Sequence, residues 1–273
     1  MTLSGAAIAE LLAAHGLSPS RALGQNFVAD PNTVRRIARL ADVGPGSQVL
    51  EIGAGLGSLT LALAETGASV VAIETDRHVV PVLRSVVEPT GVEVVEGDAL
   101  KLDLAALLAE RGAPPWSLVA NLPYNVATPL VMRALTEVKA VTRLLVMVQR
   151  EVGERMAAGP GDDAYGSVSV RIAYFASARV VGRVPASVFV PRPRVKSALV
   201  QLERRPVPAV DPSLVSYERL AAVVRAGFGQ RRKMLRRSLA GVVEPEAFTR
   251  AGVAPESRAE ELDVAAWGRL AAQ

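Results

Sequence analysis

The feature that most constrains the fold is a regular alternation of short apolar runs with helical stretches over the first 150 residues. Continuous runs of Val, Ile and Leu, unlike alternating ones, are typical of strands that are buried on both faces, and such strands form parallel sheets. The predicted strands are 48–52, 69–73, 92–95, 116–120 and 142–149. The sequence therefore predicts an α/β fold whose mostly parallel sheet is covered by helices.

Helices are predicted before, between and after these strands. Residues 1–20 suggest a short helix followed by a Ser-Pro-Ser turn, and 31–42 a helix with Asp30 as N-cap and Pro31 in its first position. Further helices are predicted at 58–65 and at 166–176, and another follows the strand 69–73 and ends at about residue 87. Two strands at 178–184 and 195–202 then follow each other without a helix, which predicts an antiparallel pair at one edge of the sheet.

A proline-rich linker, 204–212, predicts a domain boundary. We assign 1–205 to a cofactor-binding and catalytic domain, in which 1–42 form an N-terminal arm and helix. We expect residues 206–273 to form a small, entirely helical domain that binds RNA. A chain of 273 residues that is 50% hydrophobic is long enough for both.

Composition excludes several classes of protein. Without cysteine, the chain has no disulfide, thiolate metal site or cysteine nucleophile, and we expect no metal. No apolar run is long enough and free enough of charge to span a membrane, and the start of the chain lacks the basic region of a signal peptide. We therefore expect a cytoplasmic location. The net charge of +4 is only a hint of a polyanionic partner.

A glycine-rich loop, 51–57, closes the first predicted sheet strand and opens a helix. Glycine permits a tight turn and lets the backbone approach a ligand closely. The NAD fingerprint is Gly-x-Gly-x-x-Gly, whereas here the glycines stand at 53, 55 and 57. This spacing fits the Glu-x-Gly-x-Gly-x-Gly form of S-adenosylmethionine-dependent methyltransferases better.

Acidic residues follow the next two strands. Glu74 stands where a nucleotide-binding βαβ unit has its ribose-binding carboxylate, and we expect it to accept hydrogen bonds from both ribose hydroxyls. Asp98 is expected to accept from the adenine amine of the cofactor. Taken alone, each is better explained by a solvated or capping carboxylate, but three strand ends in register with one cofactor favour a binding site.

The tetrapeptide Asn121-Leu122-Pro123-Tyr124 follows the fourth sheet strand, at the edge where open α/β sheets bind ligands. An adenine amine is a poor nucleophile because its lone pair is delocalised into the ring. The amide oxygen of Asn121 and the carbonyl of Leu122 can each accept one N–H and turn the lone pair toward a methyl donor. Pro123 fixes the backbone and carries no N–H. Tyr124 offers a stacking face, worth about 1–3 kcal/mol per base.

The target base must leave its stack or come from a single-stranded region. Phe189 is a candidate for a second wall around it, although a core aromatic explains this residue nearly as well.

With these motifs, the chain resembles the bacterial small-subunit (16S) ribosomal RNA adenine N6,N6-dimethyltransferases, the KsgA/RsmA family, whose fold is a class I methyltransferase with a seven-stranded Rossmann-like sheet and a terminal antiparallel pair. The matching segments cover most of the chain and are 23–27, 51–60, 121–129, 149–152, 165–170, 189–193 and 228–235.

The resemblance implies S-adenosyl-L-methionine as cofactor, dimethylation of two adjacent adenosines near the 3′ end of 16S rRNA, and an assembling 30S particle as partner. We expect a monomer. The implied cofactor contacts are Asn26, Val28, Gly53, Gly55, Glu74, Asp98 and Asn121. The family usually has Leu at position 28 and Pro at 54, where this chain has Val28 and Ala54. Val28 is expected to make its contact through the backbone.

A basic run in the C-terminal domain is the predicted RNA contact. On a helix, its cations share one face opposite Met234, Leu235 and Leu239. An RNA substrate favours phosphate binding over a merely solvated face. The predicted RNA-binding residues are Arg232, Lys233, Arg236 and Arg237.

Two alternatives remain open at this point. The first is a 23S rRNA adenine methyltransferase of the kind that confers macrolide resistance. The second is an assembly or transcription factor that retains the fold and RNA binding without catalysis.

Overall fold

The computed structural model describes residues 2–20 and 22–273. Its main feature is a seven-stranded sheet with the strand order β4-β3-β2-β5-β6-β9-β7. The strands are β2 (Gln48–Ile52), β3 (Ser69–Glu74), β4 (Glu93–Glu96), β5 (Trp116–Asn121), β6 (Val141–Gln149), β7 (Ala176–Val184) and β9 (Ser197–Arg204). All five strands predicted for the parallel part are confirmed, and their ends differ from the prediction by one residue or none.

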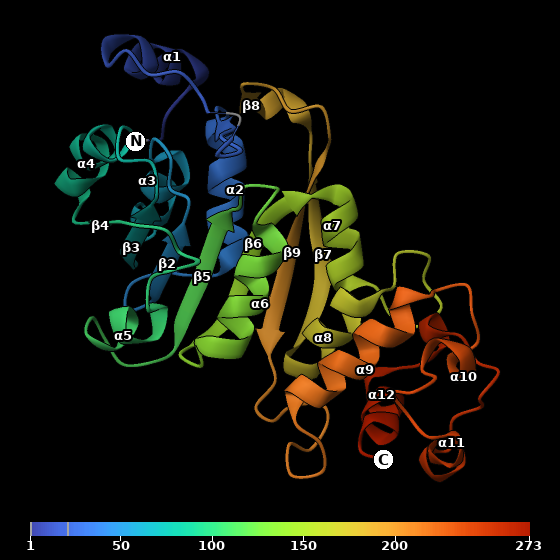
Figure 1. Cartoon of the computed structure of the whole chain (residues 1–273). Helices are drawn as coiled ribbons and strands as arrows, with labels where there is room; N and C mark the ends of the chain where they lie inside the picture. Colours follow the sequence, from blue (N-terminus) through green and yellow to red (C-terminus); the bar gives the residue numbers. More distant parts are fainter. Residues whose placement is uncertain (1, 21) are drawn as a thin grey trace. The chain divides into compact units, whose positions relative to one another are not determined.

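The parallel register brings three strand ends to one edge of the sheet. Strand β2 pairs in parallel with β3 and β5, β3 pairs with β4, and β5 with β6. Ile52, Glu74 and Asn121 are the last residues of their strands, so the loops that follow them open at the same edge. The predicted pair at the far edge is also present, and β9, which lies between β6 and β7, runs opposite to β5 (Figure 1).

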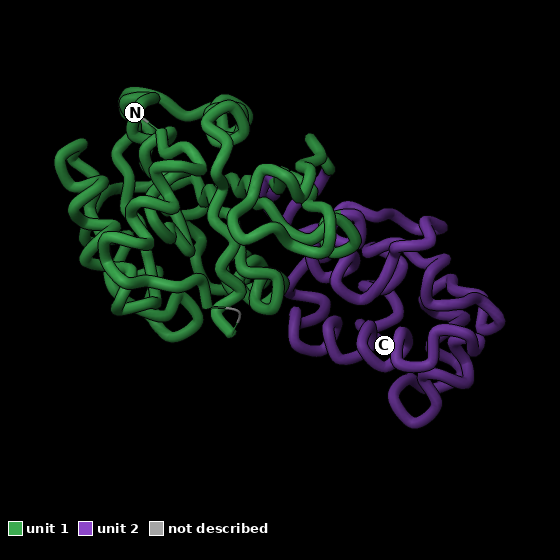
Figure 2. Tube along the Cα trace, turned by 90° about the horizontal axis from the view of Figure 1, so that it is seen from above, with its two compact units in different colours: residues 1–153, 180–202 green, residues 154–179, 203–273 purple. Residues whose placement is uncertain are grey.

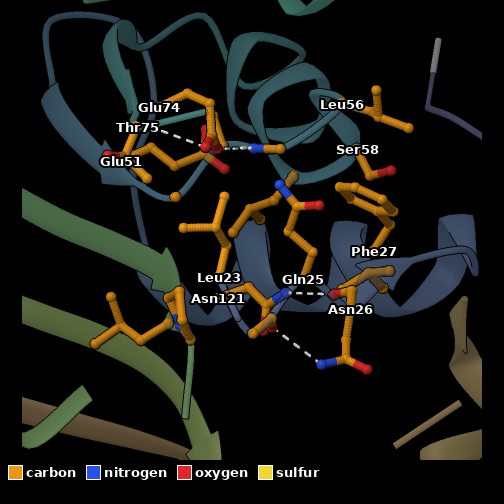
Figure 3. A pocket seen from close by; sticks show the side chains of 18 of the residues that line it. Leu23, Gln25, Asn26, Phe27, Glu51, Leu56, Ser58, Glu74, Thr75 and Asn121 are labelled. Atoms are coloured by element: carbon orange, nitrogen blue, oxygen red, sulfur yellow. Dashed lines mark hydrogen bonds between the residues drawn. The ribbon is translucent and has the colours of Figure 1, made fainter. Parts of the chain in front are cut away.

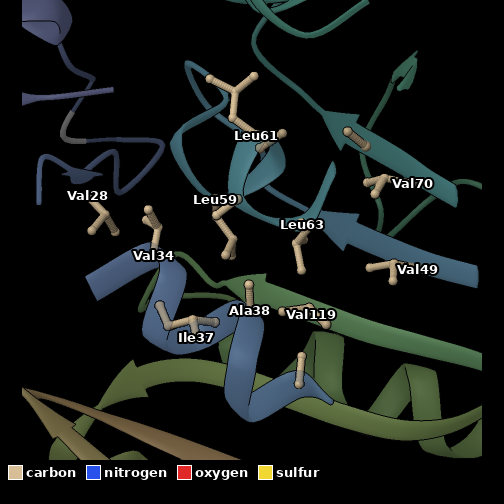
Figure 4. Packing of buried hydrophobic residues seen from close by; sticks show 14 of the residues in the cluster. Val28, Val34, Ile37, Ala38, Val49, Leu59, Leu61, Leu63, Val70 and Val119 are labelled. Atoms are coloured by element: carbon tan, nitrogen blue, oxygen red, sulfur yellow. The ribbon is translucent and has the colours of Figure 1, made fainter. Parts of the chain in front are cut away.

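Helices between the strands cover the sheet, and α2 shows why the sequence forms them. Asp30 caps α2 by accepting from the backbone N–H groups of Asn32 and Thr33, and Pro31 occupies its first turn. Its apolar face packs against α3 and the sheet, as Figure 4 shows for Ile37 and Ala38. The helices up to residue 157 are α1 (Gly5–Ala14), α2 (Pro31–Ala41), α3 (Ser58–Ala64), α4 (Val80–Val87), α5 (Leu104–Ala109), α6 (Ala127–Glu137) and α7 (Arg150–Ala157).

A second, two-stranded sheet was not predicted. It pairs β1 (Phe27–Val28) with β8 (Phe189–Val190) in antiparallel register, with Phe27 opposite Val190 and Val28 opposite Phe189. Strands of two residues are too short to show any periodicity, so the sequence carries no signal for them. The pairing fixes the N-terminal arm to the segment that leads into β9.

The chain divides into two compact units, drawn in different colours in Figure 2. The first comprises 1–153 and 180–202, and the second 154–179 and 203–273. The second unit has its own hydrophobic core around Trp267 and Phe248. Its helices are α8 (Ser167–Phe175), α9 (Tyr217–Gly229), α10 (Leu235–Ser238), α11 (Pro245–Ala251) and α12 (Val264–Ala271). Short 3₁₀ turns occur at η1 (Glu88–Thr90), η2 (Ala186–Val188) and η3 (Ala259–Glu261).

The helical unit includes more of the chain than the 206–273 that follow the linker. Tyr165, Val170 and Tyr174 are buried in its core, and the Tyr165 hydroxyl donates to the Leu262 carbonyl at 2.9 Å. Residues 154–179 therefore pack with the C-terminal helices, although strands of the first unit precede and follow them in sequence.

Candidate active site

A pocket opens at the edge of the sheet where β2, β3 and β5 end (Figure 3). Four segments line it: the glycine-rich loop, the residues after β3, the tetrapeptide after β5 and the arm 23–28. The structure thus brings together Asn26, Val28, Gly53, Gly55, Glu74 and Asn121, with Leu122, Pro123 and Tyr124 beside them. These are the residues that the sequence predicts for cofactor binding and catalysis, apart from Asp98 and Phe189.

The glycine-rich loop is hydrogen-bonded to β3, and its conformation tolerates no side chain at Gly55. The backbone N–H of Gly53 donates to the Ile73 carbonyl at 2.8 Å. Gly55 has a φ of +58°, and a Cβ there would lie 3.0 Å from the ring of Phe27. A left-handed conformation and a ring at that distance both select glycine.

Glu74 orders the loop as well as facing the pocket. Its carboxylate accepts from the backbone N–H groups of Gly55 at 2.8 Å and of Thr75 and Asp76 at 2.9 Å. Burial raises the pKa of Glu74, and these hydrogen bonds oppose the shift. A carboxylate has about four acceptor positions, so the backbone leaves it room for roughly one further donor. One free acceptor position is fewer than the two that Glu74 would need to accept hydrogen bonds from both ribose hydroxyls.

Two polar side chains at the pocket were not assigned from the sequence. Glu51 is 1% exposed, and its Oε2 is buried without a hydrogen-bond partner among the described residues; the same holds for the hydroxyl of Ser58. Both residues line the pocket. Buried polar atoms are normally hydrogen-bonded, so these two are open to a polar ligand. The acidic first position of the Glu-x-Gly-x-Gly-x-Gly motif was the signal for Glu51; Ser58 had none.

The cofactor implied by the sequence fits these residues. S-adenosyl-L-methionine carries an ammonium group, hydroxyls and an adenine amine that can satisfy free acceptors such as Glu51 Oε2 and the last position of Glu74. Gly53 and Gly55 carry no Cβ, so the backbone at these two positions can approach a ligand closely.

Burial raises the pKa of the Glu51 carboxyl to about 8, and the neighbouring Glu74 adds to the shift. The unfolded chain releases this proton near 4.5, whereas the folded protein keeps it until about pH 8. Folding is therefore increasingly penalised as the pH rises from about 4.5 to 8, and the penalty is absent below that window. We expect Glu51→Gln to raise the urea midpoint at pH 8 but not at pH 4.5. Equal differences between the two proteins at both pH values would contradict this assignment.

Asp98 lies in a neighbouring pocket. This pocket shares Leu23, Gly53, Thr75 and Pro123 with the first one. Asp98 Oδ1 accepts from the backbone N–H of Leu100 at 2.9 Å, and Oδ2 lies 3.5 Å from the ammonium of Lys101. Lys101 is 83% exposed, so this ion pair is weak and leaves the carboxylate accessible.

Asn121 is oriented by the N-terminal arm. Its Nδ2 donates to the backbone carbonyl of Asn26 at 3.1 Å, and the side chain of Asn26 donates in turn to the Gly24 carbonyl at 3.0 Å (Figure 3). Because the nitrogen of the Asn121 amide is committed to the arm, its oxygen is the atom left to accept a hydrogen. No partner for Asn121 Oδ1 occurs within residues 2–20 and 22–273.

The rest of the tetrapeptide is held just as firmly. Leu122 is buried, and its backbone N–H donates to the Met147 carbonyl at 3.1 Å. The hydroxyl of Tyr124 is hydrogen-bonded to that of Ser197 at 2.8 Å. This contact fixes the ring, so Tyr124 can present a preorganised face to a base.

The structure does not support Phe189 as a second wall of this pocket. Its side chain is 3% exposed and belongs to the core cluster with Val28, Ile37 and Leu199. The pairing of β8 with β1 buries it there, and it does not line the pocket. The alternative reading as a core aromatic is the one observed.

The basic segment is not the single helix expected from its pattern. Helix α9 ends at Gly229, residues 230–232 form a turn followed by a bend at Lys233, and only Leu235–Ser238 are helical again. Met234 makes an isolated bridge with Arg258 and is 40% exposed, so it does not join the buried face. Pairing with residues 255–258 overrides the helical preference, since the N–H groups of Leu235 and Arg236 donate to the Ser257 and Pro255 carbonyls.

The predicted RNA-binding cations are nevertheless at the surface. All four are exposed: Arg232, Lys233, Arg236 and Arg237. Arg236 pairs with Glu256 at 3.3 Å, where both side chains are more than half exposed, so the pair contributes little.

No helix in the described part of the chain is long and apolar enough to cross a membrane.

Comparison with known proteins identifies the family. The family model described as ribosomal RNA adenine dimethylase matches residues 17–272. A ribosomal RNA small subunit methyltransferase A of Phenylobacterium zucineum is 48% identical over 263 residues, which cover 96% of this chain and 90% of that protein. The protein of that name from Kineococcus radiotolerans is 44% identical, over 99% of this chain and 91% of its own length.

Solved structures agree on the fold. The 23S rRNA methyltransferase ErmE superposes with a TM-score of 0.70 at 25% identity and covers 90% of this chain and 98% of its own. A dimethyladenosine transferase from Plasmodium falciparum gives a TM-score of 0.71 at 24% identity, over 88% of this chain and 94% of its own. The fold is that of a class I S-adenosylmethionine-dependent methyltransferase, and the chain belongs to the ribosomal RNA adenine dimethylase family.

Proposed function

We propose that this enzyme dimethylates N6 of two adjacent adenosines near the 3′ end of 16S rRNA in the assembling 30S subunit and so contributes to ribosome biogenesis. The observation that supports the proposed chemistry is the hydrogen bond from Asn121 Nδ2 to the Asn26 carbonyl. It leaves Asn121 Oδ1 free to accept a hydrogen bond at the pocket. The observation that favours the small subunit is the 48% identity to a small-subunit methyltransferase over nearly the full chain.

In this proposal the tetrapeptide positions the amine. In the first methyl transfer, Asn121 Oδ1 and the Leu122 carbonyl each accept one N–H of the adenine amine, which directs its lone pair into the pocket; the monomethylated amine has one N–H left for the second transfer. Tyr124, anchored on Ser197, stacks on the base. No base needs to remove a proton first, because the methylated amine is strongly acidic. Bound S-adenosyl-L-methionine supplies an electrophilic methyl group.

The proposed cofactor contacts are Asn26, Val28, Gly53, Gly55, Glu74, Asp98 and Asn121. Glu51 joins them because of its unpaired buried oxygen. In the helical RNA-binding domain, 206–273, the proposed phosphate contacts are Arg232, Lys233, Arg236 and Arg237. We propose that the enzyme acts in the cytoplasm as a monomer on a pre-30S particle.

The decisive experiment measures transfer of labelled methyl groups to unmethylated 30S subunits, 50S subunits and naked rRNA in parallel. We expect 30S subunits to be labelled and primer extension to locate adjacent adenosines of 16S rRNA. The similarity to ErmE makes 23S rRNA the second candidate substrate. Labelling of 23S rRNA and not of 16S rRNA would establish that alternative. Binding to 30S particles without transfer would instead identify an assembly factor.

A test of the cofactor site is Glu74→Ala. Loss of a charged hydrogen bond costs about 1.5–3 kcal/mol, so we expect the Kd for S-adenosylhomocysteine to rise roughly 10–100-fold in calorimetric titration. Glu96→Ala is the matched control, because Glu96 ends β4, stands opposite Glu74 in register and is exposed. Equal Kd values for wild type and Glu74→Ala would exclude Glu74 from cofactor binding.

A further inference from the structure

The segment 191–196 between β8 and β9 carries three cations for which the catalytic site gives no role. Arg192, Arg194 and Lys196 are all exposed. No ion pair or side-chain hydrogen bond involves them within the described ranges 2–20 and 22–273. Three unpaired positive charges within five positions repel one another, so this arrangement costs stability unless an anion binds there.

Both ends of this segment are fixed to walls of the pocket. Val190, just before it, pairs with Phe27 of the arm, and Phe27 lines the pocket. Ser197, just after it, is fully buried and hydrogen-bonded to Tyr124. A residue extends the chain by at most about 3.6 Å, so every position from 191 to 196 lies within roughly 11 Å of one of these anchors. The cations therefore lie near the rim of the pocket.

The segment is also stiff and supported. Pro191 and Pro193 fix two of its six backbone φ angles, and the Lys196 carbonyl accepts from the backbone N–H of Arg150 at 2.9 Å. Restricted backbone lowers the entropy cost of binding. Lys196 shares a shallow pocket with Glu151, the one acidic residue lining that depression among those described.

We propose that Arg192, Arg194 and Lys196 form a rim that binds the phosphates of the RNA on either side of the target adenosine. A base that enters the pocket keeps its backbone at the mouth, where phosphate contacts set its register without reading sequence. The rim belongs to the first compact unit, so it is distinct from the basic segment of the second. This inference rests on the proposed RNA substrate.

The test compares two charge-matched double variants of the full-length enzyme. Arg192→Gln/Arg194→Gln removes two rim charges, and Arg39→Gln/Lys139→Gln removes two exposed charges of the same unit that line none of the pockets described. Binding to unmethylated 30S subunits and to naked 16S rRNA is measured from 50 to 200 mM salt with S-adenosylhomocysteine present. Each lost phosphate contact lowers the salt slope of the association constant by about 0.7–0.9.

We expect the rim variant to lose roughly 1.5 from the slope and at least tenfold in kcat/KM for methyl transfer, with an unchanged Kd for S-adenosylhomocysteine. The control should retain the wild-type slope. An unchanged slope in the rim variant, or an equal loss in the control, would overturn the proposal. Weaker binding to 30S subunits with normal binding to naked rRNA would also overturn it, since a ribosomal protein would then be the contact. If the wild type transferred no methyl to rRNA, the proposed function itself would fail.

Discussion

Asn121→Ala should abolish methyl transfer while leaving the binding of RNA largely intact. The substitution removes the amide oxygen that accepts an amine hydrogen and also the Nδ2 contact to the Asn26 carbonyl. Removing one preorganised polar group of this kind costs about 10²–10³ in rate elsewhere, and here orientation of the nucleophile is lost as well. We expect the single-turnover rate with 30S subunits to fall by about 10³-fold or more.

Asn121→Asp separates the two roles of the side chain. Aspartate keeps an acceptor for the amine but cannot donate to the Asn26 carbonyl, so its rate should lie between those of the wild type and the alanine variant. Asn32→Ala, at an exposed position of α2, controls for loss of an asparagine side chain. A near wild-type single-turnover rate for Asn121→Ala would refute the amine-positioning model, whatever the affinity for RNA.

Trp267→Ala should destabilise the helical unit by about 3–5 kcal/mol, the range observed for removal of a large buried aromatic side chain. Trp267 is fully buried, and a Cβ on Gly227 would lie closer than 3.0 Å to its ring. The ring of Phe228 packs against it at 5.8 Å between centroids. Urea unfolding followed by circular dichroism reports this loss, and the fluorescence of Trp116 follows the other unit, because the chain has only two tryptophans.

Trp267→Phe should cost much less than the alanine substitution. The buried Nε1 of Trp267 has no acceptor among the described residues, and an unpaired buried donor costs about 1–3 kcal/mol. Phenylalanine keeps most of the packing and removes this donor. Leu214→Ala, at a side chain that is 70% exposed in the same unit, should change stability by less than about 0.5 kcal/mol. Equal losses for the alanine and phenylalanine variants would show that packing around the ring is not what matters.

The sheet and the cofactor loop could be predicted from sequence because their signals are local. Strands such as 69–73 are nearly continuous apolar runs. The glycines at 53, 55 and 57 define a turn, and the spacing that identifies this turn lies within a few neighbouring residues. Asn121 to Tyr124 were found for the same reason: strand end, turn and functional group lie within four positions. These parts of the structure needed no knowledge of distant contacts.

The errors came from interactions between distant segments. The basic segment has a helical pattern, yet the backbone N–H groups of Leu235 and Arg236 donate to carbonyls within residues 255–258, and the helix is interrupted before Leu235. Phe189 stands in a motif beside the site, but pairing with Val28 turns it into the core. Glu51 was recognised only as part of a motif, since the burial that leaves one of its oxygens unpaired depends on tertiary packing.

The discontinuous second unit has a consequence for synthesis of the chain. Residues 154–179 leave the ribosome early, but the helices that bury Tyr165, Val170 and Tyr174 are complete only at Ala271. At about 5–20 residues per second, this interval lasts roughly 5–20 s. During this interval the first unit can already fold, whereas the three side chains of the second unit remain exposed to solvent. The nascent chain therefore still exposes these three side chains to aggregation and chaperone binding after the residues that line its catalytic pocket have been synthesised.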